Sequence, residues 1–217
     1  MRIEEAKWIA DQLKDIDASS KVLNIGSSTK QFRQEIQPHI DKLVFNSLSE
    51  RNIQVVHCDI KKDEGVDLIG DIMEKEFADK VKDMNFNVVI CSNVLEHIEN
   101  LSHFCNSLEY ILPTGSRLFI TVPNIYPFHK DLIDTKFRPN IEEVAVLFPG
   151  CVVIEGVILR SYESHFVTLI KNPYTLLLTL KNWLIPRFGI EEWKKRCSDI
   201  PNLFKKYRMT CIVFQKK

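Results

Sequence analysis

The chain has 217 residues, a length that favours one domain with appendages over two full domains. Apolar residues make up 45% of it, and with only 7 glycines and 9 prolines the composition excludes disordered, collagen-like and low-complexity classes. Lysine and arginine total 29, as do aspartate and glutamate, so the net charge is zero. Because no global basic field draws the chain to nucleic acid, no nucleic-acid partner is expected.

The cysteines and the N-terminal stretch indicate the compartment. Six cysteines are scattered without a C-x-x-C pair, and several lie within apolar runs, as buried free thiols do. The first residues are charged and lack the apolar core of a secretory signal. The most apolar stretch, Tyr174 to Leu180, stops at Lys181, well short of the roughly 20 residues that span a bilayer. We therefore expect a cytoplasmic protein without a transmembrane segment.

Short apolar runs alternate with segments of helical period along the chain. Residues 4–16 have the three- and four-residue apolar spacing of an amphipathic helix. The continuous apolar run at 86–91 is typical of a strand buried on both faces. The predicted strands are 21–25, 54–58, 66–69, 86–91, 117–122, 151–159 and 209–214, and the predicted helices are 4–16, a short run up to Pro38, 40–48, 101–112, 142–147, 174–183 and 191–197.

This alternation predicts an α/β fold, in which helices cover both faces of a mostly parallel sheet. We expect a single domain over residues 1–217, with a segment at 123–140 covering the substrate and a helical insertion at 164–206. In such folds, ligands bind outside the carboxyl ends of the strands. Small, acidic or amide residues follow the predicted strands: Gly26-Ser27-Ser28, Asp59, Gly70-Asp71, Ser92-Asn93 and Pro123-Asn124.

Two of these strand ends point to a nucleoside. A glycine after the first strand, Gly26, lets the backbone turn tightly beside a ligand, and an acid after the second, Asp59, can accept hydrogen bonds from ribose hydroxyls. The dinucleotide fingerprint G-x-G-x-x-G is absent, since Gly26 stands alone where three glycines are needed. A nucleoside cofactor without a pyrophosphate is therefore favoured over a nicotinamide dinucleotide.

From Lys21 to Val122 the sequence resembles the class I S-adenosylmethionine-dependent methyltransferases. The most specific motif is the run from Val89 to Ile98, VICSNVLEHI. The likeness implies a Rossmann-like methyltransferase sheet whose last strand is antiparallel. The other motifs are VLNIGSS at 22–28, VHCDI at 56–60 and GDI at 70–72, while segments 37–41, 64–68 and 126–134 are similar to methyltransferases associated with bacterial surface-polysaccharide biosynthesis.

The resemblance implies roles for the residues at the strand ends. Gly26 and its loop, with Ser27 and Ser28, would hold the methionine portion of S-adenosylmethionine, and Asp59 would hold the ribose. Asn24 stands where the family has an acid that helps to bind the methionine portion. The remaining cofactor-binding candidates are Asp71 for the adenine amino group, Ile72 against the adenine ring, Asn93 beneath the sulfonium, and Ser92 beside Asn93.

The segment from Pro123 to Asn140 follows the fifth main strand and is expected to lie over the cofactor. Methyl transfer to a hydroxyl needs a base, because an alcohol becomes nucleophilic only as its proton leaves. His129 is the first candidate, oriented by Asp131 or Asp134, and His97 is the alternative base. The spacing of His129, Asp131 and Asp134 also suits a divalent metal, although no metal ligand is assigned.

Several of these candidate residues also suit a purely structural role. Asp71 is equally suited to a helix cap, His97 and His129 to structural hydrogen bonds, and Arg138 to an ion pair with Asp134. The helical stretch 174–197 is predicted to be a lid or a core helix, and a peripheral membrane or partner contact is the alternative.

Together these features predict an S-adenosylmethionine-dependent methyltransferase, a transferase that moves a methyl group to oxygen. The expected acceptor is a sugar hydroxyl of a surface-glycan or related small-molecule precursor. A catalytically weak methyltransferase-like scaffold or partner protein is the alternative. The sequence leaves the oligomeric state open.

Overall fold

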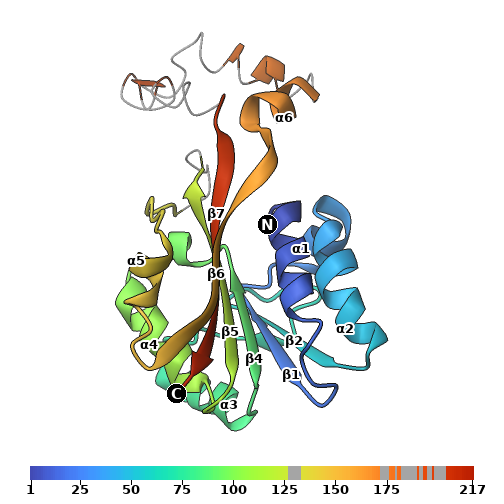
Figure 1. Cartoon of the computed structure of the whole chain (residues 1–217), viewed down its shortest axis with the longest axis vertical. Helices are drawn as coiled ribbons and strands as arrows, with labels where there is room; N and C mark the ends of the chain where they lie inside the picture. Colours follow the sequence, from blue (N-terminus) through green and yellow to red (C-terminus); the bar gives the residue numbers. More distant parts are fainter. Residues whose placement is uncertain are drawn as a thin grey trace.

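The computed structural model describes residues 1–126, 133–171 and 204–217, together with residues 176–178, 180, 181, 190, 193, 194 and 197. Its centre is a seven-stranded sheet in the order β3-β2-β1-β4-β5-β7-β6 (Figure 1). All neighbouring strands are parallel except that β7 runs antiparallel to both β5 and β6. The strands are β1 (Lys21–Ile25), β2 (Gln54–Asp59), β3 (Leu68–Ile69), β4 (Val88–Ser92), β5 (Arg117–Ile125), β6 (Cys151–Ser164) and β7 (Lys206–Lys216).

Helices cover both faces of the sheet. Helices α1 and α2, with two helical turns between β1 and α2, pack on one face, and α3, α4 and α5 pack on the other. The predicted α/β fold with a mostly parallel sheet and one antiparallel strand is therefore confirmed. The helices are α1 (Ile3–Gln12), α2 (Asn46–Glu50), α3 (Lys75–Asp83), α4 (Leu101–Ile111), α5 (Ile141–Ala145) and α6 (His165–Lys171), with further helical turns at Phe32–Ile36, Asp41–Phe45 and Leu95–His97.

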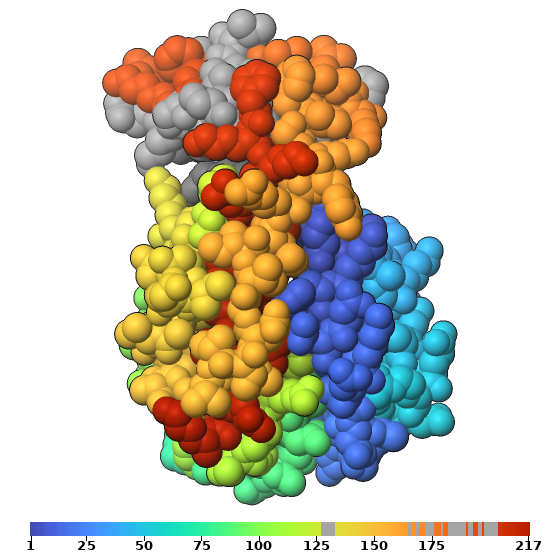
Figure 2. All heavy atoms as spheres, in the orientation of Figure 1, coloured from blue at the N-terminus to red at the C-terminus, as the bar shows by residue number. Residues whose placement is uncertain are grey.

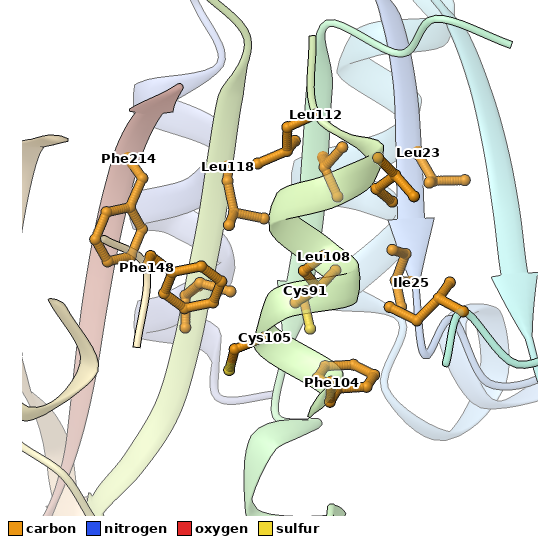
Figure 3. Packing of buried hydrophobic residues seen from close by; sticks show 14 of the residues in the cluster. Leu23, Ile25, Cys91, Phe104, Cys105, Leu108, Leu112, Leu118, Phe148 and Phe214 are labelled. Carbon is orange, nitrogen blue, oxygen red and sulfur yellow. The ribbon is translucent and has the colours of Figure 1, made fainter. Parts of the chain in front are cut away.

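Alternate residues of the central strands are buried in two different hydrophobic layers. Leu23 and Cys91 face α4, where they lie near Phe104 and Leu108 (Figure 3). Their neighbours in sequence, such as Val22, face α1 and α2 instead. A parallel strand that is covered on both faces needs a continuous apolar run. This explains why the apolar run at 86–91 predicted β4 as a strand buried on both faces. This packing fixes the strand ends on which the site is built.

The last strands are longer than the sequence predicted. β5 continues through Pro123, which lies opposite Met209 at an irregularity in the β5–β7 ladder, the kind of position where a strand tolerates proline. β6 and β7 extend beyond the body of the sheet and carry α6 at their far end (Figure 1). Most of the helical insertion predicted at 164–206 lies outside the described residues.

Helix α1 lies beside the upper part of β6 (Figure 2). The buried Glu4 carboxylate of α1 accepts a 2.6 Å hydrogen bond from the backbone N–H of Tyr162 in β6. This contact ties the N-terminal helix to the projecting hairpin. Among the described residues, no helix is long and apolar enough to cross a membrane.

Candidate active site

The carboxyl ends of β1, β2, β4 and β5 lie along one edge of the sheet, because these strands are parallel. Gly26, Asp59, Asn93 and Tyr126 follow or end these strands in turn. The β6–β7 hairpin projects beyond this same edge (Figure 1). The structure thus brings together the strand-end residues that the sequence analysis selected, in the place where α/β folds bind their ligands.

The turn after β1 requires glycine at position 26. Gly26 has a φ of +67°, and a Cβ there would lie 2.4 Å from Cγ2 of Val94. The next residues are tied to β2: the backbone N–H of Ser27 donates to the Cys58 carbonyl at 3.0 Å, and that of Ser28 donates to Oδ2 of Asp59 at 2.9 Å. The loop therefore bends back so that its backbone meets the acid at the end of the neighbouring strand.

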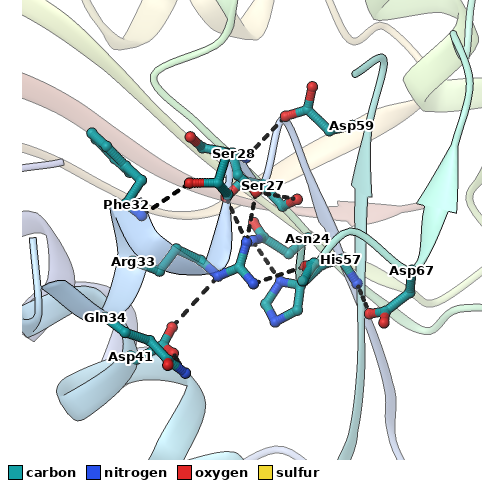
Figure 4. A network of polar contacts seen from close by, with 12 residues as sticks. Asn24, Ser27, Ser28, Phe32, Arg33, Gln34, Asp41, His57, Asp59 and Asp67 are labelled. Atoms are coloured by element: carbon teal, nitrogen blue, oxygen red, sulfur yellow. Dashed lines mark hydrogen bonds and ion pairs between the residues drawn. The ribbon is translucent and has the colours of Figure 1, made fainter. Parts of the chain in front are cut away.

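A buried arginine holds this loop from beneath (Figure 4). The guanidinium of Arg33 donates to the carbonyl oxygens of Ser27 at 3.0 Å, Ser28 at 2.7 Å and Gly65 at 2.9 Å. Asp41 lies 3.6 Å from Nε of Arg33 and supplies the opposite charge. Burial lowers the pKa of Arg33, because the charged guanidinium is removed from water. Its five N–H donors in a fixed, planar fork allow it to bind three carbonyl oxygens at once. The sequence analysis did not select Arg33.

Asn24 is engaged beneath the loop. Its side-chain amide lies 3.1 Å from Nδ1 of His57 (Figure 4). Burial, with a contribution from the Arg33 charge, lowers the pKa of His57 to about 4, so the imidazole is neutral and Nδ1 can accept the amide hydrogen. The neutral pair replaces the acid that the related family has at position 24, and it gives His57 a defined partner that the sequence analysis did not predict.

The acids after β2 and β3 differ in their contacts. Asp59 accepts hydrogen bonds from Ser28 at Oδ2 and from the backbone N–H of Lys61 at Oδ1, the latter at 3.1 Å. Oδ1 of Asp71 accepts the backbone N–H of Met73 at 2.9 Å, which stabilises the turn before α3. The helix cap suggested as its structural role is wrong, because α3 begins at Lys75 and its N-cap is Glu74. Ile72 is only 3% exposed and belongs to the hydrophobic core. Both carboxylates keep acceptor capacity for a ligand, since each oxygen has two lone pairs.

Polar residues from different elements also gather after β4. Asn93 has a φ of +53°, and its side-chain amide donates a 2.9 Å hydrogen bond to Oε1 of Glu5 in α1. Ser92 ends β4, and its buried hydroxyl has no hydrogen-bond partner among the described residues. An orphaned hydroxyl at a strand end is a group that a bound ligand can satisfy. Glu5 was not selected from the sequence, although it lies one helical turn before the buried Ile9.

Glu96 is a buried acid within the most specific sequence motif. Its side chain is fully buried, and neither carboxylate oxygen has a hydrogen-bond partner among the described residues. Burial raises the pKa of Glu96 to about 7, and the nearby charge of Glu5 adds to the increase. Oε1 of Glu96 lies 3.8 Å from Nε2 of His97. Glu96 therefore titrates in the pH range in which many proton transfers are catalysed.

The orientation of His97 is defined by its other nitrogen. Nδ1 lies 2.6 Å from the carbonyl oxygen of Ile133, and because a carbonyl only accepts, Nδ1 carries the hydrogen. The lone pair is then on Nε2, on the side of Glu96. In the neutral imidazole, the hydrogen bond to Ile133 therefore selects the tautomer with its hydrogen on Nδ1.

The predicted covering segment is described only in part. His129 and Asp131 lie outside the described residues, so their predicted roles remain predictions. Oδ2 of Asp134 accepts a 2.7 Å hydrogen bond from Arg138, which is the ion pair weighed for Arg138. Tyr126 stacks on Tyr207 of β7 with ring centroids 4.5 Å apart. Within the described parts of the chain, no group of three or more acidic, histidine or cysteine side chains is arranged to hold a metal ion.

The cysteines take no part in this site. All six thiols are free, and five of them are buried: Cys58, Cys91, Cys105, Cys151 and Cys211. Burial raises the pKa of Cys58 and of Cys105 to about 12, which suppresses the thiolate. The predicted free and buried thiols are therefore confirmed at these five positions, and their role is to fill the core.

The fold and the strand-end geometry define an α/β protein whose polar residues gather at the carboxyl edge of its sheet, where such folds bind their ligands. Residues 3–147, more than half of the chain, match the model of a family described as a methyltransferase domain. The chain belongs to this methyltransferase family. A comparison of the sequence with curated proteins gives no match.

Solved structures with low sequence identity share the fold. Coclaurine N-methyltransferase, bound to N-methylheliamine and SAH, has 14% identity and a TM-score of 0.60, with 99% of this chain and 70% of that chain covered. The cyclase SpnF has 13% identity and a TM-score of 0.57, with 99% and 80% covered. Phosphoethanolamine N-methyltransferase 2 of Haemonchus contortus, in complex with phosphomonomethylethanolamine and S-adenosylhomocysteine, has 15% identity and a TM-score of 0.53, with 98% and 52% covered. This chain thus spans about half of the nematode enzyme, and the cyclase illustrates that one fold serves more than one reaction.

Proposed function

We propose that this protein transfers a methyl group from S-adenosylmethionine to an oxygen of a small-molecule acceptor, a sugar hydroxyl of a surface-glycan precursor. The observation that carries the cofactor assignment is the strand-end arrangement in which the glycine turn at Gly26, the N–H of Ser28 and the carboxylate of Asp59 meet. Membership of a methyltransferase family and two neighbours crystallised with SAH support the same cofactor.

The residues present fit such a cofactor. The orphaned hydroxyl of Ser92 supplies an unsatisfied polar atom at the carboxyl edge. Asp59 would hold the ribose, the loop after Gly26 the methionine portion, and Asp71 the adenine amino group, each with acceptor capacity beyond its present contacts. When bound, S-adenosylmethionine supplies a methyl group on a positively charged sulfur.

The chain's contribution to the reaction is to position the acceptor and to accept its proton. A hydroxyl is a poor nucleophile until its proton leaves, so transfer to oxygen needs a base close to the cofactor. We assign this role to His97, which follows β4 and whose Nδ1 donates to the Ile133 carbonyl. The ionised Glu96 carboxylate, 3.8 Å from Nε2, would stabilise the imidazolium. His129, oriented by Asp131 or Asp134, is the alternative base.

The acceptor class rests on the proton requirement and on the resemblance to methyltransferases of surface-polysaccharide biosynthesis. The experiment incubates the protein with S-adenosylmethionine and a panel of nucleotide sugars, and measures S-adenosylhomocysteine formation. We expect product with a sugar that carries a free hydroxyl and none with the matching deoxy sugar. An amine panel is the control, and methylation of amines without methylation of sugars would contradict the oxygen assignment.

The scaffold alternative has one observation in its favour. The side chain of Asn24, which stands in place of the family acid, is engaged with His57. If that substitution has abolished cofactor binding, the folded protein will bind neither S-adenosylmethionine nor its product.

A further inference from the structure

A cluster of basic side chains lines a pocket on the projecting part of the β6–β7 hairpin. The pocket has a volume of about 290 Å³. Its lining residues are Ile125 at the end of β5, Arg160 of β6, Lys205 just before β7, and Lys206 and Arg208 of β7. Four of its five lining residues are cations, in a chain whose net charge is zero. The positive charge of the chain is therefore concentrated locally at this pocket.

Among the described residues, these cations lack acidic partners. Within the parts of the chain that the structure describes, none of the four makes an ion pair, and the nearby Glu163 is paired with Lys171. Arg160 and Arg208 are direct partners in the β6–β7 register, so two like charges face each other across the strands. Like charges directly opposite each other destabilise a sheet. Among the described residues, the pocket therefore has four positive charges without a paired acid, an arrangement that an anionic ligand would stabilise.

The pocket adjoins the candidate active site. Arg208 is also the register partner of Ile125, the last residue of β5, and Ile125 directly precedes Tyr126. Tyr207, between Lys206 and Arg208, stacks on Tyr126. Thr210, which shares a strand face with Arg208, donates a 2.6 Å hydrogen bond to the Pro139 carbonyl in the segment predicted to cover the substrate. The pocket thus begins at the end of β5, next to the carboxyl edge of the sheet.

We infer that this pocket binds a phosphate or pyrophosphate group of the methyl acceptor, so that the substrate class is a phosphorylated sugar compound. The inference rests on the proposed function for the identity of the acceptor, whereas the anion site itself rests on the residues of the pocket. Arginine pairs with phosphate oxygens through two parallel N–H donors, and lysines add positive charge. The same group can come from a soluble phosphate compound or from a lipid headgroup, and the experiment separates these sources.

The test uses inorganic pyrophosphate as the probe and the whole 217-residue chain. Calorimetric titration compares the wild type with Arg160→Gln and Arg208→Gln, and with the control Arg117→Gln, which removes a positive charge at the opposite end of β5. We expect binding that weakens about tenfold or more in each pocket variant, that is unchanged in the control, and that declines with added salt. Absence of binding to the wild type, or an equal loss in the control, would overturn the inference.

A second arm uses vesicles of phosphatidylcholine with anionic phosphatidylglycerol. Vesicle binding that depends on Arg160 and Arg208 and that pyrophosphate does not compete away would overturn the assignment to a phosphorylated acceptor and indicate a membrane-binding patch. Titration of the same samples with S-adenosylmethionine keeps the two proposals distinct. Unchanged cofactor binding in the pocket variants confines their effect to the anion site, and absent cofactor binding in the wild type contradicts the proposed function alone.

Discussion

The backbone N–H of Ser28 donates a 2.9 Å hydrogen bond to the carboxylate of Asp59, which joins the turn after β1 to the end of β2. The acid that is assigned to the ribose is thus also the anchor of the loop assigned to the methionine portion. Arg33 reinforces the same loop by binding the Ser27 and Ser28 carbonyls from the other side. Binding of the ribose and of the methionine portion is therefore expected to depend on one connected structure.

The turn at Gly26 gives the first prediction. Gly26→Ala forces an alanine into a φ of +67° and places its Cβ 2.4 Å from Val94. The left-handed conformation costs roughly 1–2 kcal/mol, and the overlap adds a packing cost of about 1–3 kcal/mol. Gly115→Ala is the matched control, since Gly115 has a φ of +81° but no atom within 4 Å of the added Cβ. Urea unfolding should show a larger loss of stability for Gly26→Ala, and equal losses would argue against the close approach of Val94.

The second prediction concerns the three carbonyls held by Arg33. Arg33→Met leaves these acceptors without their charged donor, and hydrogen bonds to charged groups contribute roughly 1.5–3 kcal/mol each. We expect the variant to lose about 3 kcal/mol or more of unfolding free energy and to bind S-adenosylmethionine more weakly. Arg33→Lys keeps the charge without the fork geometry. Full recovery of both properties in Arg33→Lys would show that charge alone supports the loop.

The buried acid Glu96 predicts a pH dependence of stability. Because its pKa is raised from 4.5 to about 7 in the folded protein, the stability linked to Glu96 is fully present below pH 4.5. It is lost as the pH rises to about 7. Glu96→Gln removes the titrating group, so its stability relative to the wild type should increase between pH 5 and pH 8, by up to about 3 kcal/mol. Denaturant unfolding of both proteins at these two pH values measures the change, and a pH-independent difference would contradict a buried, protonated Glu96.

The fourth prediction separates the two candidate bases. A general base contributes about 10²- to 10⁴-fold to the rate, so replacing it should reduce turnover by that factor while cofactor binding is retained. The orientation of His97 leads us to expect this loss in His97→Ala. The parallel variant is His129→Ala. Near-normal turnover of His97→Ala with bound cofactor would remove His97 from this role and leave His129 as the candidate.

Local apolar patterns predicted the strands of the sheet. The position of the candidate site, at the carboxyl ends of these strands, followed from that prediction. The apolar runs around Leu23 and Val89 are local signals, and parallel strands bring their carboxyl ends to one edge whatever the loops do. The length of β5 was underestimated, because Pro123 is normally a strand breaker and its tolerance depends on the bulge formed with β7.

Contacts between residues distant in sequence could not be predicted in the same way. Arg33 meets the carbonyl of Gly65, and Glu5 meets Asn93, only after the chain has folded. A signal for Glu5 was nevertheless present, since it lies four residues before Ile9 on the apolar face of α1. Glu96 had no such signal, because a buried acid at the end of an apolar run resembles an exposed one in sequence.

The central claim is that the carboxyl edge of the sheet binds S-adenosylmethionine through Asp59. Calorimetric titration with S-adenosylmethionine and S-adenosylhomocysteine, with NAD as the negative ligand, tests it most directly. We predict micromolar binding by the wild type and by Asp63→Ala, a nearby acid outside the site, and binding about 10- to 100-fold weaker or undetectable in Asp59→Ala. A well-folded wild type that binds neither ligand, or an Asp59→Ala variant that binds as tightly as the wild type, would contradict this account.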